Sequence, residues 1–355
     1  MKQVAVLAFV TMLTACIHAG EAPALPIAVA PSDSNIRYVG RFDLRKGDAP
    51  ACAWPGSTIV ARFKGTALNV KLRSSKGEDY FEVVIDGARQ PVLTLNKDQT
   101  LYRAADKLAP GEHLLELVKR TEAMSSTAVF LGLELEAGSS LLALPARPER
   151  RIEFYGDSVT CGNSDEGTKP NEKMARNISN NYLAYGAVTA RALNAEFTCI
   201  AWSGRKLWPD STLPEVADFT LASWDNAPKW NYAWVPQAVV INLGSNDYGN
   251  GIPEEKGWTN AYKEFIKSRR EHYPDCHIFC CLCSSILGKE RTGMRALTRS
   301  VVESLQQAGD TKIHFVEFKE QTGPDGIGPG WHPTVKTHQI MADTLAPEIK
   351  KALKW

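Results

Sequence analysis

Apolar and polar residues alternate in the first part of the chain, between Arg37 and Leu135. The alternating runs lie at residues 58–63, 68–72, 80–85 and 113–117. Turn residues such as Asp86-Gly87 and Pro110-Gly111 separate these runs, and no convincing helical pattern intervenes. Short alternating runs between frequent turns predict an all-β sandwich of the jelly-roll type.

The pattern changes after a proline-containing linker at residues 145–148. We expect strands at residues 152–155, 197–201, 238–243, 277–283 and 313–318. We expect helices at residues 181–194, 258–272, 294–307 and 333–351. Strands that are apolar throughout and alternate with helices indicate a parallel sheet covered on both faces. The second part therefore predicts a three-layer α/β domain with a parallel five-stranded sheet.

The N-terminal residues have the pattern of an export leader. Lys2 precedes an apolar stretch at residues 4–13 that is too short to span a bilayer. Leu13-Thr14-Ala15-Cys16 resembles a bacterial lipobox, in which Cys16 would carry a lipid anchor. Cleavage by ordinary signal peptidase near Ala19 is the alternative. Either route predicts an exported protein that is periplasmic, anchored in the outer membrane or extracellular.

Length and composition fit a two-domain soluble protein. The chain has 355 residues, and we divide it into a leader and linker (1–30), a β-sandwich (31–145) and an α/β domain (146–355). Its hydrophobic content of 44% and charged content of 23% are ordinary. The net charge of +1, without a dense Lys/Arg stripe, argues against nucleic acid or an anionic membrane surface as a partner. The oligomeric state stays open.

Cysteine usage fits export poorly. Seven cysteines remain besides Cys16, and an odd number cannot all pair within one chain. The cluster at residues 276–283 lacks the paired C-x-x-C spacing of a zinc site, and residues 277–283 also form a continuous apolar run. We therefore interpret these cysteines as small hydrophobic residues and expect no metal. One disulfide is possible, without an assigned pairing.

Three loops bring candidate catalytic groups to the carboxyl ends of strands. They contain Gly156-Asp157-Ser158, Gly244-Ser245-Asn246-Asp247 and Gly330-Trp331-His332-Pro333. Active groups of open parallel sheets gather at that edge. Acyl transfer needs a nucleophile, a base and donors for the oxyanion. The sequence predicts Ser158 as nucleophile and His332 as base, with the Ser158 backbone N–H and the Asn246 amide as oxyanion donors.

These motifs resemble three of the four blocks of the SGNH (GDSL-type) hydrolases, and Gly204 best matches the remaining block. Segments in the first half resemble the N-terminal jelly roll of carbohydrate esterase family two, namely residues 37–42, 54–57, 111–113 and 119–122. Members of that family remove acetyl groups from plant polysaccharides. The resemblance implies that Gly204 supplies a third oxyanion N–H. It also implies deacetylation of a carbohydrate, such as xylan or mannan, through an acetyl-Ser158 intermediate without a cofactor.

The motif around His332 departs from the usual pattern. Many SGNH enzymes have an Asp three residues before the His, where this chain has Pro329. The resemblance offers a solution, because some family members use a Ser-His dyad in which a backbone carbonyl replaces the acid. We prefer that interpretation. Asp325 and Glu320, on the same loop, are the alternative carboxylates.

Other residues near these motifs have weaker signals. We interpret Asp157 and Asp247 as structural carboxylates that bind backbone N–H groups, and His338 as a structural or exposed histidine. Four aromatic residues lie in or beside the motif loops, and we expect at least one to stack on a sugar ring. In order of preference they are Trp331 and Trp208, followed by Trp202 and Tyr248.

Two alternative functions remain from the sequence. One is a lipase-like or thioesterase activity, and the other is a glycan-binding protein whose hydrolase half is inactive. The intact set of Ser158, Asn246 and His332 favours catalysis over binding alone.

Overall fold

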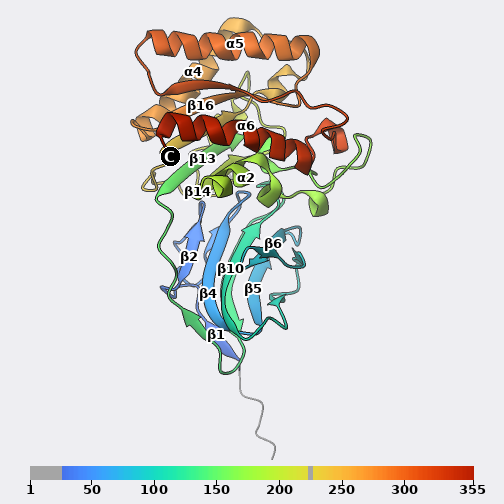
Figure 1. Ribbon diagram of the computed structural model, residues 1–355, viewed down its shortest axis with the longest axis vertical. Coiled ribbons are helices and arrows are strands. Elements are labelled where there is room, and N and C mark those ends of the chain that lie inside the picture. The colour runs from blue at the N-terminus through green and yellow to red at the C-terminus, as the bar shows by residue number, and fades with distance from the viewer. Residues whose placement is uncertain (1–25, 223–226) are drawn as a thin grey trace, which may run out of the picture.

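The computed structural model describes residues 26–222 and 227–355. Two domains follow one another along the long axis of the molecule, a β-sandwich and an α/β domain (Figure 1). The predicted two-domain architecture is therefore confirmed. The expected leader, with its lipobox at Cys16, lies outside the described residues. None of the described helices is long and apolar enough to cross a membrane.

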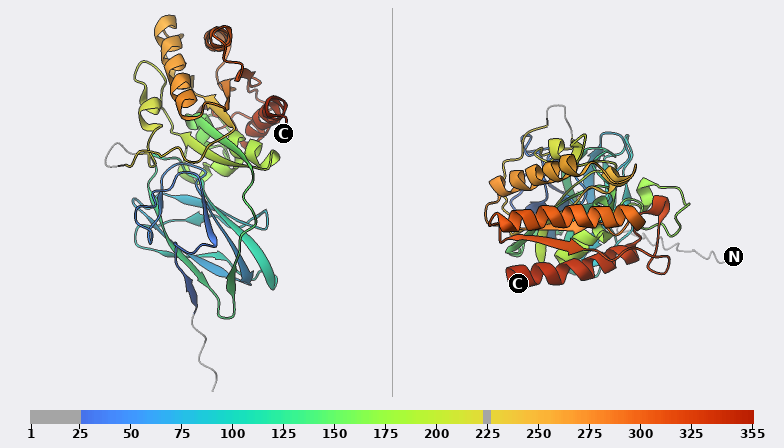
Figure 2. Two further views of the ribbon diagram at one scale, coloured as in Figure 1. Left: turned by 90° about the vertical axis from the view of Figure 1, so that its left-hand side faces the viewer. Right: turned by 90° about the horizontal axis from the view of Figure 1, so that it is seen from above.

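The first domain consists of two antiparallel sheets that pack face to face (Figure 2). One sheet has the order β1-β11-β5-β9, with β3 also paired to β11: β1 (Ile27–Val29), β3 (Ala51–Cys52), β5 (Leu68–Ser74), β9 (Leu101–Ala105) and β11 (Ala128–Leu135). The other has the order β12-β4-β10-β6-β7, with β2 paired to β4 and β8 to β6: β2 (Ile36–Val39), β4 (Thr58–Gly65), β6 (Tyr80–Ile85), β7 (Ala88–Arg89), β8 (Leu93–Thr94), β10 (Gly111–Lys119) and β12 (Ser140–Leu142). Alternate residues of β5, namely Leu68, Val70 and Leu72, are buried between the sheets, which is the pattern that predicted the sandwich.

The first sheet begins earlier than the expected boundary at residue 31. Strand β1 pairs with β11 through Ile27–Leu135 and Val29–Leu133, so three residues assigned to the linker belong to the sandwich. A strand of three residues contains too few positions for a period-two pattern to be visible.

The second domain contains a parallel sheet of order β14-β13-β15-β16-β17, as predicted. Its strands are β13 (Arg150–Gly156), β14 (Ala195–Ala201), β15 (Ala238–Asn242), β16 (His277–Leu282) and β17 (Ile313–Glu317). Its helices are α1 (Ser158–Cys161), α2 (Tyr185–Ala192), α3 (Thr212–Val216), α4 (Glu255–His272), α5 (Gly288–Gln307) and α6 (Val335–Leu353). Short 3₁₀ turns are η1 (Arg176–Ile178), η2 (Asn181–Leu183), η3 (Ser245–Tyr248) and η4 (Pro329–Trp331).

The helices cover both faces of this sheet. Trp258 and Tyr262 of α4 and Met294 of α5 join one buried cluster, whereas Met341 and Leu345 of α6 join the cluster on the opposite face. The view from above shows α5 and α6 on opposite sides of the sheet (Figure 2). This is the three-layer arrangement that the apolar strands predicted.

The helix expected at residues 181–194 is shorter than predicted. Ala184 has an extended backbone and separates η2 from α2. The buried side chain of Asn181 instead donates hydrogen bonds to the carbonyl oxygens of Thr160 and Cys161, behind the candidate nucleophile. A side chain that binds distant backbone groups competes with continuous helix.

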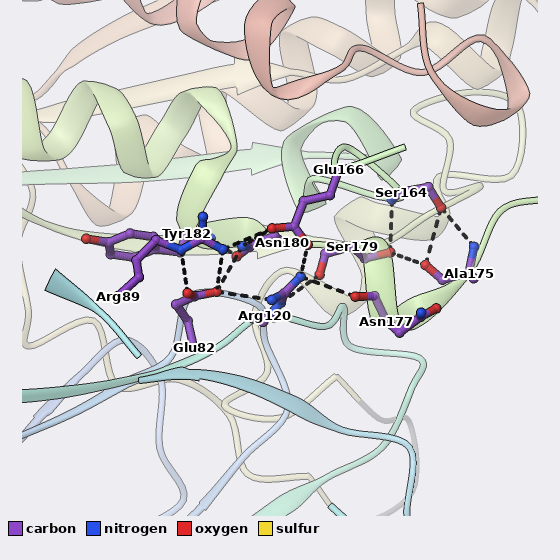
Figure 3. A network of polar contacts seen from close by, with 10 residues as sticks. All are labelled: Glu82, Arg89, Arg120, Ser164, Glu166, Ala175, Asn177, Ser179, Asn180 and Tyr182. Carbon is purple, nitrogen blue, oxygen red and sulfur yellow. Dashed lines mark hydrogen bonds and ion pairs between the residues drawn. The ribbon is translucent and has the colours of Figure 1, made fainter. Parts of the chain in front are cut away.

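Buried polar contacts join the two domains (Figure 3). Arg120, which follows β10, pairs with Glu82 of β6 at 3.1 Å and with Glu166 of the α/β domain. Asn180 donates to both Glu82 and Glu166, and Arg89 of β7 also binds both carboxylates. The loop after β10 is therefore fixed against the α/β domain.

Candidate active site

Ser158 is the first residue of α1, directly after β13. Asp157 is the N-cap of this short helix, and its carboxylate accepts a hydrogen bond from the Val159 N–H at 3.1 Å. Position 156 has no room for a side chain, because a Cβ there would lie 2.7 Å from the Asn242 carbonyl oxygen. The glycine lets β13 and β15 approach closely while the chain turns sharply, which places the Ser158 hydroxyl at the edge of the sheet.

His332 lies between the Ser158 hydroxyl and a backbone carbonyl. Its Nε2 is 2.7 Å from Ser158 Oγ, and its Nδ1 is 3.1 Å from the Pro329 carbonyl oxygen. A neutral imidazole with its proton on Nδ1 satisfies both contacts, since Nδ1–H donates to the carbonyl and Nε2 accepts from the hydroxyl. The carbonyl belongs to the residue that stands where many SGNH enzymes have an Asp.

Burial lowers the pKa of His332 from its ordinary value. The Pro329 carbonyl and the negative charge of Glu122 act in the opposite direction and raise this pKa. Because burial is the largest effect, the imidazole is neutral at pH 7 and can accept a proton.

The loop that carries His332 is held by backbone hydrogen bonds. The Gly328 N–H donates to the His332 carbonyl at 2.8 Å, and the Gly330 N–H donates to the Pro170 carbonyl at 2.9 Å. Gly330 and Trp331 both have positive φ angles, of 61° and 59°. This conformation turns the Pro329 carbonyl back toward the imidazole.

The two alternative carboxylates have other partners. Asp325 accepts from Lys319 at 2.7 Å and from Thr322 at 2.8 Å. Glu320 lies 3.7 Å from Arg291 Nε. Among the described residues, His332 has hydrogen bonds to Ser158 and Pro329 and to no carboxylate.

Gly204 lies in a turn that begins at Trp202, directly after β14. The Arg205 N–H donates to the Trp202 carbonyl at 3.2 Å, and Gly204 has a φ of 76°, as the third position of a type II turn requires. The Asn246 side chain donates to the Arg205 carbonyl at 2.9 Å, so the two proposed oxyanion donors are linked. One N–H of the Asn246 amide remains for another acceptor.

Asp157 and Asp247 hold the motif loops together. Asp157 also accepts from the Ser245 hydroxyl, and Asp247 accepts from the backbone N–H of Trp208 at 2.8 Å and from Trp258 Nε1 at 3.1 Å. Burial raises the pKa of both carboxyls to about 6. These contacts agree with the structural interpretation of both residues.

The four candidate aromatic residues differ in exposure. Trp331, next to His332, is 59% exposed, whereas Trp208 is half-buried and Trp202 has the Arg205 guanidinium 4.0 Å above its ring. Tyr248 is only 2% exposed and packs edge-on against Trp258. The expectation that Tyr248 contacts sugar is therefore corrected, because its ring belongs to the core.

Sequence reasoning did not single out Glu122 as a site residue. This buried side chain belongs to the sandwich domain, yet it accepts from the Ser203 N–H at 2.8 Å and from Asn163 Nδ2 at 2.9 Å. Glu122 ends the segment at residues 119–122 that resembles the family's jelly roll, but that resemblance gave it no role in the other domain.

The cysteines that the structure describes are all free and buried. Cys280 and Cys281 lie inside β16 and pack in the clusters on opposite faces of the sheet. Across residues 26–222 and 227–355, no group of three or more His, Cys, Asp or Glu side chains could hold a metal ion.

Similarity to known proteins covers both domains. The family model described as "Carbohydrate esterase 2 N-terminal" matches residues 38–145, and that described as "GDSL-like Lipase/Acylhydrolase family" matches residues 154–340. The cellulase/esterase CelE of Acetivibrio thermocellus is 39% identical over 332 residues, which cover 92% of this chain but 40% of CelE. This chain thus spans less than half the length of that relative. An acetylxylan esterase/glucomannan deacetylase of Cellvibrio japonicus is 27% identical over 97% of this chain and 96% of its own length.

Solved structures give the same assignment. A family two carbohydrate esterase from Clostridium thermocellum, in complex with cellohexaose, has a TM-score of 0.87 and 39% identity over 90% of this chain and 99% of that chain. A family two carbohydrate esterase from Cellvibrio japonicus has a TM-score of 0.84 and 25% identity over 93% of this chain and 99% of that chain. With a sandwich followed by a hydrolase domain and the Ser158–His332 pair at the sheet edge, the chain belongs to carbohydrate esterase family two of the GDSL-like hydrolases.

Proposed function

We propose that this protein removes acetyl groups from carbohydrates with a Ser158–His332 dyad. The observation that carries this proposal is the alignment of Ser158 Oγ, the His332 imidazole and the Pro329 carbonyl, at 2.7 and 3.1 Å. A hydroxyl hydrogen-bonded to an oriented, neutral imidazole is the arrangement that activates serine for acyl transfer.

In the first half of the reaction, Ser158 Oγ attacks the ester carbonyl carbon and its proton passes to His332 Nε2. The carbonyl oxygen becomes an oxyanion, for which the N–H groups of Ser158 and Gly204 and the Asn246 amide are the donors. The C–O bond to the sugar then breaks, and the sugar oxygen takes the proton from His332. Acetyl-Ser158 remains.

In the second half, His332 takes a proton from water, whose oxygen attacks the acetyl carbon. The bond to Ser158 breaks, the proton returns to Ser158 Oγ, and acetic acid leaves and gives its own proton to the solvent to become acetate. Both halves create an imidazolium, and the Pro329 carbonyl accepts its Nδ1–H throughout. Each oxyanion donor removed is expected to lower the rate by about 100- to 1,000-fold.

A carbohydrate is the proposed carrier of the ester. Relatives named acetylxylan esterase/glucomannan deacetylase support this choice, as does the cellohexaose complex of a relative. The exposed indole of Trp331 beside His332 offers a flat apolar face, which suits the C–H groups of a sugar ring.

We further propose that the protein is exported, because of the leader pattern at residues 1–30 and the lipobox at Cys16.

The test is acetate release from acetylated xylan and glucomannan, with Ser158→Ala as the matched variant. Wild-type protein should release acetate, and the variant should lose activity by about 10,000-fold or more at unchanged stability. Parallel assays with acetyl and octanoyl esters distinguish a deacetylase from a lipase-like enzyme. Wild-type rates in Ser158→Ala would refute the mechanism, and a preference for octanoyl esters would refute the substrate.

A further inference from the structure

We propose that Glu122 of the sandwich domain is a positioning residue of the active site, which holds the Ser203–Gly204 turn beside Ser158 and places a negative charge near His332. The proposal rests on the acyl-transfer mechanism above and extends it to the other domain. It makes the sandwich part of the catalytic apparatus.

The first support is the set of hydrogen bonds at the Glu122 carboxylate. One oxygen accepts from the Ser203 N–H at 2.8 Å, and the other accepts from Asn163 Nδ2 at 2.9 Å. Asn163 Nδ2 also donates to Ser203 Oγ at 3.1 Å. Ser203 precedes Gly204, and the Asn163 N–H donates to the Ser158 carbonyl at 3.0 Å. One carboxylate therefore joins the turn with the Gly204 oxyanion donor to the segment that follows the nucleophile.

The second support is the rigidity of the loop that presents Glu122. Lys119 is fully buried, pairs with Asp79 at 3.0 Å, and donates to the carbonyls of Thr121 and Glu122. Arg120 pairs with Glu82 within the sandwich and with Glu166 across the domain boundary (Figure 3). Because Lys119 binds the carbonyls of Thr121 and Glu122 and Arg120 anchors the backbone just before them, the Glu122 carboxylate has a defined position. Preorganised donors give catalysis only when their position is held in this way.

The third support is charge. The negative charge of Glu122 raises the pKa of His332. His338 of α6 adds no charge there, because burial lowers its pKa to about 3 and keeps it neutral. Asp157, next to the nucleophile, is engaged elsewhere, because its carboxylate accepts hydrogen bonds from the Val159 N–H and the Ser245 hydroxyl. Glu122 thus stabilises the imidazolium without touching it. In a triad, a carboxylate in contact with the imidazole has this role.

Two substitutions separate the positioning effect from the charge effect. Glu122→Ala removes both hydrogen-bond acceptors, and we expect kcat for 4-nitrophenyl acetate to fall by about 10- to 100-fold with little change in KM. Glu122→Gln keeps an acceptor for the Ser203 N–H but removes the charge. It should retain more of kcat while the acid limb of kcat/KM shifts by about half a pH unit toward lower pH, because loss of the charge lowers the His332 pKa.

Glu78→Gln is the matched control. Glu78 of the sandwich also joins the two domains, through a pair with Arg176 at 2.9 Å, but it takes no part in holding the loop that presents Glu122. Its kcat should stay within about twofold of the wild type. The acid limb of its kcat/KM profile should stay within about a tenth of a pH unit. Equal losses in Glu78→Gln and Glu122→Gln would overturn the proposal, because they would indicate a general effect of the interface. An unshifted acid limb with wild-type kcat in Glu122→Gln would overturn it as well. If Glu122→Ala fails to fold, the Gln variant decides alone.

A second readout does not depend on the proposed substrate. The rate at which a fluorophosphonate modifies Ser158 reports on the same nucleophile, base and oxyanion donors. We expect a fall of about tenfold or more in Glu122→Ala and an unchanged rate in Glu78→Gln. If wild-type protein reacts with the probe but hydrolyses no acetyl ester, the proposed substrate is wrong. The probe rates then still decide the role of Glu122, and equal rates in all variants would refute it.

Discussion

The imidazole of His332 is oriented by a peptide carbonyl, which carries a partial charge in place of the full charge of a carboxylate. The missing Asp, together with the resemblance to family members that use a backbone carbonyl, predicted this type of partner, but not which carbonyl accepts the Nδ1–H. That choice depends on the positive φ angles of Gly330 and Trp331, and a positive φ at Trp331 is not expected for a large side chain. The loop conformation, rather than a residue type, therefore determines the contact with Pro329.

The proposed dyad predicts that both neighbouring carboxylates are dispensable. Asp325→Asn and Glu320→Gln should keep kcat/KM within about threefold of the wild type, because these side chains bind Lys319, Thr322 and Arg291 instead of His332. Hydrolysis of 4-nitrophenyl acetate measures this directly. A loss of about 10,000-fold in either variant, as for a triad Asp→Asn change, would restore a Ser-His-acid mechanism.

The buried histidine of α6 predicts a dependence of stability on pH. The pKa of His338 is about 3 in the folded protein, below its ordinary 6.5, because the ring is buried and, to a lesser extent, because a charge on His332 would repel it. The His338 Nδ1 accepts a hydrogen bond from the Tyr185 N–H. Below pH 6.5 the unfolded chain binds a proton there that the folded protein does not. The stabilisation is therefore complete above pH 6.5 and is lost as the pH falls toward 3.

His338→Gln keeps an acceptor for the Tyr185 N–H and removes the titration. The free energy of unfolding, measured with urea, falls when the pH is lowered from 7 to 5. This fall should be about 2 kcal/mol smaller in the variant than in the wild type. Other histidines titrate in both proteins and cancel in the comparison. Equal falls would mean that His338 is protonated in the folded state.

At the scale of elements, strands buried on both faces were predictable and irregular segments were not. The central strands β15 and β16 are buried apolar runs that few other structures accommodate, so their positions followed from the sequence. Strand β3 has two residues, and the break between η2 and α2 depends on the distant partners of Asn181. Such features arise from tertiary contacts, which a local pattern does not contain.

The short element η4 carries both the carbonyl that orients His332 and the exposed ring of Trp331. Trp331→Ala should raise KM for acetylated oligosaccharides by about 3- to 10-fold, the value of one aromatic stacking contact. Hydrolysis of 4-nitrophenyl acetate should not change, because the Trp331 carbonyl still accepts from Gln321 Nε2. Equal losses with both substrates would instead indicate that the loop had moved.

At the scale of the whole molecule, the two domains share buried surface. Trp54 and Ala123 belong to the sandwich but pack in the cluster that contains Trp258 and Tyr262 of α4. The hydrophobic pattern identified two domains correctly, since each has its own core. It did not indicate this shared surface, because burial by a neighbouring domain and burial within a domain have the same pattern.

The shared surface predicts that the domains stabilise each other through Arg41. This sandwich residue is fully buried, pairs with Glu153 of β13 at 3.0 Å, and donates to the carbonyl of Ala217 at 2.5 Å. Arg41→Ala would leave the Glu153 carboxylate buried without its cation. We therefore expect the free energy of unfolding to fall by about 3–5 kcal/mol in urea titrations followed by tryptophan fluorescence.

The matched control is Arg45→Ala. The guanidinium of Arg45 is exposed, so loss of its pair with Asp43 should leave stability unchanged. If the domains fold as one unit, Arg41→Ala shifts a single transition that sandwich and α/β probes report together. Two separate transitions would show that the contact between the domains contributes little to stability. If the sandwich unfolds first, the positioning of Glu122 is lost before the α/β domain unfolds. Esterase activity followed through the same titration locates that loss: it should disappear with the single transition in wild-type protein.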